Sequence, residues 1–134
     1  MVTKTFDPNG AIPDNGNYFG IPLEPQDGAL VLISAPWDLS LKARNGSSYA
    51  PDAIIEASRS VDFFEPMAPH SWRKGIATVP IDYSIQDLSH RLRSDAERVV
   101  KVHSQGGTAF DSLVYERSLR RVNDGYTTLN TNIY

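Results

Sequence analysis

The sequence predicts an α/β fold built on a mostly parallel sheet, and three features indicate it. Residues 29–36 form a continuous apolar run of strand length, which is typical of a strand buried on both faces. A proline-initiated helical segment at 51–60 and a second strand at 75–81 follow, in the order of a βαβ crossover. Two amphipathic helical segments then follow in the last part of the chain.

The first 28 residues are predicted to form an extended arm. Turn formers are dense in Asp7-Pro8-Asn9-Gly10, Pro13-Asp14-Asn15-Gly16-Asn17 and Pro22-Leu23-Glu24-Pro25, where each restricts the backbone or bonds to it locally. Several apolar residues interrupt them, namely Ile12, Tyr18, Phe19, Ile21 and Leu23. We therefore expect the arm to pack on its own domain or on a neighbouring subunit, with a partly ordered terminus as the alternative.

Residues 29–134 are predicted to contain the α/β elements. The first strand should end at Pro36, because proline has no N–H for the ladder. The loop that follows leads to helix 51–60, where Pro51 suits the first turn and Asp52 suits the positive end of the helix dipole. The residues of this helix available for packing are Ile54, Ile55 and Ala57.

Two longer helices are predicted in the last third of the chain. Ser84-Ile85-Gln86-Asp87 resembles a capping box, and Gly106-Gly107 is expected to end the helix that it starts. Thr108 is expected to cap a second helix that ends at Asn123-Asp124-Gly125. The predicted inward faces are Ile85, Leu88, Leu92, Ala96, Val99 and Val100 in the first helix, and Phe110, Leu113, Val114 and Val122 in the second.

Length and composition exclude several classes of protein. With 134 residues and a net charge of −3, the chain has the size of one ordinary globular domain. No apolar stretch reaches the roughly 18–20 residues of a membrane span, and the first residues lack the apolar core of a secretory signal. The absence of cysteine favours a reducing cytoplasm. The arginines of the long helices alternate with carboxylates, so nucleic-acid binding is not expected.

The sequence offers no catalytic or metal-binding constellation. Its three histidines are His70, His90 and His103, and the last two point to different sides of one straight helix. No Asp-x-His-x-Asp or His-x-x-x-His cluster occurs. Cysteine is absent, and no Gly-x-Ser-x-Gly turn presents a serine. We therefore expect neither catalytic residues nor metal ligands within this chain.

The candidate site is the loop after the first strand, because open α/β sheets bind ligands at the carboxyl ends of their strands. Its small hydroxyl residues suit hydrogen bonds to a small polar ligand, and the candidate residues of the loop are Ser40, Gly46, Ser47 and Ser48. The alternative is a structural loop. In that interpretation Asp38 caps the turn, Trp37 packs on the sheet edge and Ser48 caps the following helix.

Two stretches carry a family resemblance, and they are Leu32-Ile33-Ser34-Ala35-Pro36-Trp37-Asp38 and Asn45-Gly46-Ser47-Ser48-Tyr49-Ala50-Pro51-Asp52-Ala53-Ile54. The first resembles the strand end and Pro-Trp turn of the ureohydrolases, the arginase/agmatinase family, and the second resembles the signature that opens their first helix. Flanking stretches such as Val61-Asp62-Phe63-Phe64 and Trp72-Arg73-Lys74-Gly75-Ile76 resemble the agmatinase-like bacterial branch. The resemblance covers essentially the entire chain.

The resemblance implies a three-layer arginase-like fold with a mostly parallel sheet, of which only the arm, the first βαβ unit and the following helices are present. It implies hydrolysis of a guanidino C–N bond with release of urea, and two Mn²⁺ ions, or Ni²⁺ in some members, that activate a bridging water. It also implies a small guanidino compound as substrate and trimers or hexamers of like subunits. The family counterparts of Ser40 and of Gly46-Ser47-Ser48 border the substrate pocket.

The ligand segments of that family are missing from this sequence. They are a Gly-Gly-Asp-His segment, an Asp-x-His-x-Asp segment and a later Asp-x-Asp, all downstream of the region that this chain resembles. We therefore expect residues 29–134 to be the amino-terminal part of a ureohydrolase domain, inactive alone. The alternative is a non-catalytic interaction or assembly module derived from the same family. In either case strand 29–36 needs further covering elements, so we expect the isolated chain to be poorly soluble, oligomeric or held by a partner.

Overall fold

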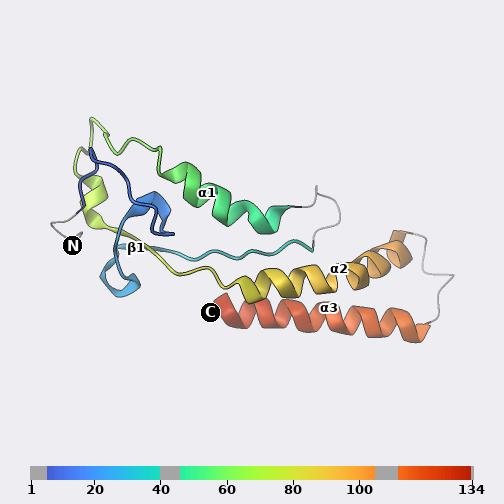
Figure 1. The fold of residues 1–134 in the computed structure, drawn as a ribbon. Helices are drawn as coiled ribbons and strands as arrows, with labels where there is room; N and C mark the ends of the chain where they lie inside the picture. The colour runs from blue at the N-terminus through green and yellow to red at the C-terminus, as the bar shows by residue number, and fades with distance from the viewer. Residues whose placement is uncertain (1–5, 40–45, 105–111, 134) are drawn as a thin grey trace. The chain divides into compact units, whose positions relative to one another are not determined.

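The computed structural model describes residues 6–39, 46–104 and 112–133 (Figure 1). The chain forms two compact units. The sheet unit comprises residues 1–34 and 49–81, and the helical unit comprises residues 35–48 and 82–134.

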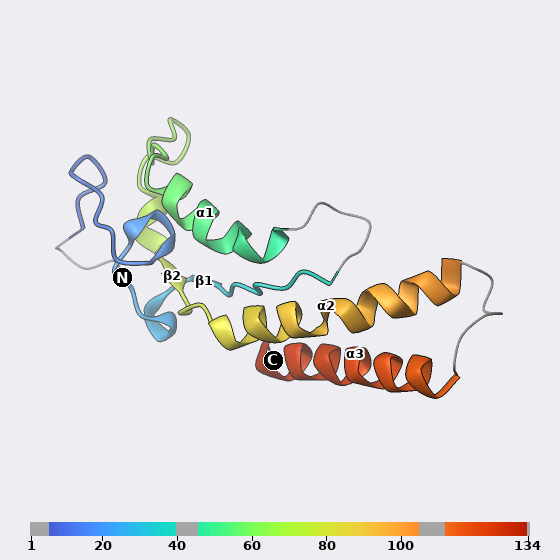
Figure 2. The ribbon, with the colours of Figure 1, turned by 45° about the vertical axis from the view of Figure 1, so that its right-hand side comes forward.

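The sheet unit contains a two-stranded parallel sheet. Strand β1 (Leu30–Leu32) lies beside β2 (Ile76–Thr78) (Figure 2) and pairs with it, and the register places Leu30 opposite Ile76. Helix α1 (Ala50–Ser58) lies between them in the chain. The prediction of an α/β fold is therefore confirmed in its coarse form, a strand, a helix and a second strand parallel to the first. Short 3₁₀ turns occur at Tyr18–Gly20, Pro25–Asp27, Ser47–Tyr49 and Ser71–Lys74.

Strand β1 is shorter and more exposed than the apolar run predicts. It covers three residues rather than eight, and the side chains of Leu30 and Ile33 are 52% and 53% exposed. The expectation of burial on both faces is wrong for the described residues, because Val31 as well as Leu30 and Ile33 is exposed, so neither face of the run is fully covered by them. Apolar side chains of this run are therefore exposed to solvent.

The arm packs on its own unit. Phe6, Ile21 and Leu23 are buried against Ala77 of β2. Two backbone donors of the arm are also tied to regular elements, because the Tyr18 N–H donates to Thr78 Oγ1 at 2.9 Å and the Phe19 N–H donates to Ser58 Oγ at 2.7 Å. These bonds anchor the turn in which Phe19 takes a φ of 60°, a conformation uncommon outside glycine.

Helix α1 begins and ends within two residues of the predicted range. Pro51 occupies the first turn as expected. Of the three residues predicted to pack, only Ile55 is buried, whereas Ile54 is 54% exposed and Ala57 is exposed. The nine-residue helix buries one narrow face, so neighbours of Ile55 along the chain point to solvent.

The helical unit is a pair of helices, α2 (Tyr83–Ser104) and α3 (Ser112–Ile133), which lie side by side in both ribbon views (Figures 1 and 2). Their core contains Leu92, Ala96 and Val122 together with Leu39 from the preceding loop. The predicted apolar face of α2 is largely confirmed. The exception is Val100, which is 47% exposed, while Val102 is buried in its place.

The ends of these helices differ from the prediction. The cap of α2 is Asp82, whose Oδ1 accepts the Ser84 N–H at 2.9 Å, so the capping box at Ser84 is wrong by two residues. Residues Gly106, Gly107, Thr108 and Phe110 lie outside the described part. Leu113 and Val114, predicted to face inward, are 72% and 39% exposed.

The predicted helix stop at Asn123-Asp124-Gly125 is also wrong, because α3 continues to Ile133. Gly125 is needed for packing rather than for a turn. A Cβ atom at this position would lie 2.2 Å from Leu92 Cδ1 and 3.4 Å from Trp37 Cη2. Glycine therefore allows α3 to approach α2 closely, which outweighs its low helix propensity.

Among the described residues, no helix combines the length and the apolar character that a membrane crossing requires.

Candidate functional site

The predicted site loop lies in the helical unit, and the structure shows part of it. Ser40 lies outside the described residues. Gly46 is half-buried, Ser47 is exposed and Ser48 is fully buried. The loop end therefore presents Ser47 and Gly46 to solvent, while the side chain of Ser48 points into the protein.

Asp38 is the anchor of this loop. Its Oδ2 accepts the Gly46 N–H at 2.7 Å and lies 3.0 Å from Arg93 Nη2. The Asp38 N–H donates to Ser89 Oγ at 2.8 Å, and its carbonyl oxygen accepts a short hydrogen bond from Arg93. Asp38 as a whole is only 3% exposed. Its contacts join the two ends of the loop to each other and hold them on α2.

The charge of Asp38 is favoured by the same contacts. The Gly46 N–H and the Arg93 guanidinium hold the pKa of this carboxyl below its ordinary value, although burial acts in the opposite direction. A carboxyl with a lowered pKa in the folded state stabilises that state above the unfolded pKa of about 3.9. This stability is lost as the pH falls through the folded pKa.

We expect Asp38→Asn to destabilise the helical unit by about 1.5–3 kcal/mol at neutral pH, because charge-assisted hydrogen bonds are lost. Urea unfolding between about pH 5 and pH 2 tests the linkage. The wild-type protein should lose more stability over this range than the variant. Asp87→Asn is the control, since Asp87 is exposed on α2, the helix to which Asp38 holds the loop. Identical acid sensitivity in wild type and Asp38→Asn would contradict the role of this carboxyl.

Ser48 forms a contact with a histidine that is distant in sequence. Ser48 Oγ lies 3.2 Å from His90 Nε2, and the Ser48 carbonyl accepts the Gln86 side chain at 2.9 Å. A serine and a histidine at this distance resemble a nucleophile and its base. Ser48 has no exposed surface, however, so a substrate carbonyl has no access to its hydroxyl. The pair therefore serves to fix the loop on α2.

The structural interpretation of the loop is wrong for Ser48, and Asp38 bonds to Gly46, eight residues along the chain, rather than to a local turn. Trp37 packs on Tyr126 of α3, with ring centroids 5.3 Å apart. Ser48 does not cap α1, whose preceding residue Tyr49 makes no side-chain cap.

Sequence reasoning missed the α2 residues that hold the loop, which are Gln86, Ser89, His90 and Arg93. One signal was available. Ser89 follows Ile85 by four positions and precedes Leu92 by three, so it falls within the apolar face of the helix. A hydroxyl in that position must be buried and needs a partner, which predicts an incoming polar segment.

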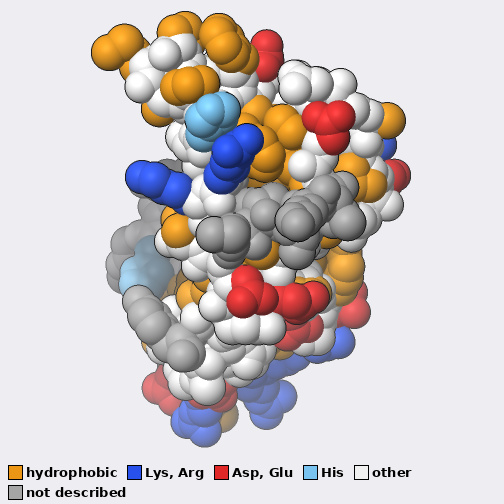
Figure 3. Space-filling view, turned by 90° about the vertical axis from the view of Figure 1, so that its left-hand side faces the viewer, with side chains coloured by type: hydrophobic (Ala, Val, Ile, Leu, Met, Phe, Trp, Pro, Cys, Tyr) orange, Lys and Arg blue, Asp and Glu red, His pale blue; other side chains and the backbone are white. Residues whose placement is uncertain are grey.

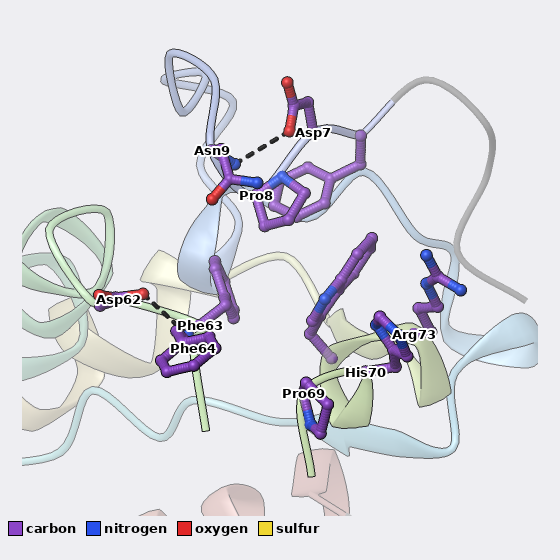
Figure 4. Close-up of a pocket in the computed structure, with 11 residues that line it drawn as sticks. Asp7, Pro8, Asn9, Asp62, Phe63, Phe64, Pro69, His70 and Arg73 are labelled. Carbon is purple, nitrogen blue, oxygen red and sulfur yellow. Dashed lines mark hydrogen bonds between the residues drawn. The ribbon is translucent and has the colours of Figure 1, made fainter. Parts of the chain in front are cut away.

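A second candidate site is a hollow of about 390 Å³ in the sheet unit (Figure 4). Three segments line it: the start of the arm, residues 62–64 and residues 69–73. Its apolar floor is built around Phe6, whose ring meets Phe63 and Trp72 edge to face at centroid distances of 5.8 Å. No local sequence pattern predicts this hollow, because the three segments that line it are separated along the chain.

Across residues 6–39, 46–104 and 112–133, no group of three or more histidine or acidic side chains is arranged to hold a metal ion.

The chain was compared with models of protein families, with curated proteins and with solved structures, and none of these comparisons finds a match.

Proposed function

We propose that this chain forms the amino-terminal part of a metal-dependent hydrolase that cleaves a guanidino C–N bond and releases urea, with its catalytic centre outside these residues. The proposal starts from the motif resemblance at 32–38 and 45–54. The structural observation that supports it is the exposed apolar strand β1. Parallel strands of this composition are normally covered on both faces, so β1 has the character of a strand from a larger sheet.

The position of the predicted site loop also supports the proposal. The loop leaves the carboxyl end of β1, where open α/β sheets bind their ligands. Asp38 and Arg93 hold it in place, and Ser47 remains exposed. In the proposed enzyme, Ser40 and the stretch Gly46-Ser47-Ser48 border the pocket for a small guanidino compound.

The metal pair of such an enzyme, Mn²⁺ or Ni²⁺, does not fit the residues described here, since they provide no ligand cluster. The proposal therefore assigns the metal ligands to the remainder of the enzyme and assigns no catalytic step to this chain. Its partners are that remainder and like subunits in a trimer or hexamer. The absence of cysteine suits the cytoplasm as its compartment.

The exposed strand also favours a second candidate, a non-catalytic module that assembles with a related protein. Leu30, Val31 and Ile33 would then be covered by another chain rather than by further strands of the same enzyme. Both candidates require that other residues pack on β1. They differ in whether the reading frame that encodes this chain also encodes the catalytic segments.

The coding DNA beyond the Tyr134 codon distinguishes the two candidates. The hydrolase proposal predicts that the frame continues and encodes a Gly-Gly-Asp-His segment, followed by Asp-x-His-x-Asp and Asp-x-Asp. A frame that stops without these segments would contradict it and favour the assembly module.

A further inference from the structure

The hollow in the sheet unit carries charges of both signs around its aromatic floor. Asp62 Oδ1 accepts the Phe64 N–H at 2.8 Å, and Asp7 Oδ1 accepts the Asn9 N–H at 3.0 Å. These bonds orient each carboxylate and occupy one of its oxygens. Within the described parts of the chain, neither carboxylate has a cationic partner within ion-pair distance.

Arg73 supplies the positive charge. Its guanidinium lies over the ring of Trp72, 5.5 Å from the centroid, which holds it at the edge of the hollow. No carboxylate of the described residues pairs with it. Its charge and its hydrogen-bond donors are therefore available to a ligand.

The two signs of charge are separated across the hollow. Figure 4 shows Asp62 and Arg73 at opposite sides, with the side chain of Phe63 between them and Asp7 on a third side, and Trp72 also lines the hollow. Figure 3 shows hydrophobic side chains at the surface close to a histidine and to cationic side chains. A ligand that neutralises both ends must therefore carry two opposite charges with an apolar segment between them.

We propose that this hollow binds a small zwitterion whose ammonium and carboxylate groups stand at the two ends of an aliphatic chain. The ammonium group pairs with Asp62 and is also attracted by Asp7. The methylene groups lie on Phe63 and Trp72, and the carboxylate pairs with the Arg73 fork. A simple α-amino acid does not meet this demand, because its two charged groups are attached to one carbon.

The size and composition of the hollow suit such a ligand. A volume of about 390 Å³ lies at the lower end of the range of about 300–1,000 Å³ for small-molecule sites. Phe6 is 8% exposed, so the floor is apolar, while the charged groups stand at the rim. Apolar walls with a few placed polar groups are the usual composition of a ligand pocket.

Calorimetric titration of the full chain at low salt with 6-aminohexanoate tests the proposal. Hexylamine and hexanoate are the matched probes, since each retains the chain and one charge. We expect saturable one-to-one binding of 6-aminohexanoate, about tenfold tighter than either single-charge probe, because each end gains a charge-assisted pair. Asp62→Asn and Arg73→Gln should each weaken binding about tenfold.

Two variants serve as controls for net charge and local folding. Glu65→Gln removes the same charge from the same segment as Asp62→Asn, and Lys74→Gln does the same for Arg73→Gln, yet neither residue lines the hollow. Both should bind 6-aminohexanoate like the wild-type protein. Asparagine at position 62 retains an oxygen for the Phe64 N–H, so the segment should keep its conformation. Equal affinity for hexylamine, unchanged binding by both test variants, or no saturable binding of 6-aminohexanoate would overturn the proposal.

Discussion

Replacing Arg98 and Arg121 together by methionine is expected to lower the unfolding free energy of the helical unit by about 3 kcal/mol. Asp95 of α2 is 4% exposed, and its carboxylate contacts Arg98, Arg121 and the hydroxyl of Ser118. Arg98 Nη1 donates to Asp95 Oδ1 at 3.1 Å, and Arg121 Nη1 forms an ion pair with Oδ2 at 2.9 Å without an aligned hydrogen bond. Removing both arginines leaves the buried Asp95 carboxylate without a counter-charge, and an unpaired buried charge strongly destabilises the folded state.

The cost should depend on which partner is removed. Asp95→Ala deletes the buried charge, and the arginine side chains, 39% and 55% exposed, can be hydrated instead. Adding Asp95→Ala to the double arginine variant should therefore recover part of the lost stability. Arg91→Met with Arg120→Met is the control, since both residues are exposed on the same two helices. Chemical denaturation measures all four proteins, and a double variant as stable as the control would contradict this account of the cluster.

Replacing Ile33 by lysine is expected to convert the chain from a self-associating protein into a monomer. Ile33 follows β1 directly and is 53% exposed, next to the exposed side chains of Leu30 and Val31. A short apolar strand with an open edge is a template for association with another chain, and a lysine on such an edge opposes it. Sedimentation velocity across a concentration series measures the change in mass.

Ile54→Lys is the matched control for this experiment. Ile54 is the same residue type with nearly the same exposure, 54%, but it lies on α1. If β1 drives association, the Ile54 variant should associate like the wild-type chain. A wild-type chain that is monodisperse and monomeric, with a cooperative thermal transition, would contradict the expectation that β1 needs cover.

Local sequence patterns predicted the elements of the fold and misplaced some of their ends. The apolar run at 29–36 and Pro51 correctly indicated β1 and α1, and the helical periodicity after Asp82 correctly indicated α2. The prediction that Gly125 ends a helix is wrong. Glycine is needed there because the side chain of Leu92, on α2, packs where a Cβ atom would lie. That requirement depends on tertiary contact and leaves no local pattern.

The candidate site was predictable only in part for the same reason. The loop residues Gly46 and Ser48 stood out by composition, but their partners lie far along the chain. Asp38 and Arg93 are separated by 55 positions, and Ser48 and His90 by 42. The hollow around Phe6 joins three distant segments, so its aromatic floor could not be assembled from spacing alone.

The central claim is that this chain forms the amino-terminal, non-catalytic part of a guanidino hydrolase. Urea release is the direct test, measured with agmatine, arginine, a guanidino acid and guanidine in the presence of Mn²⁺ or Ni²⁺. We predict metal-dependent urea release from one of these compounds by the product of the complete reading frame, and none by residues 1–134 alone. Urea release by residues 1–134 alone, or none by the complete product, would contradict the claim.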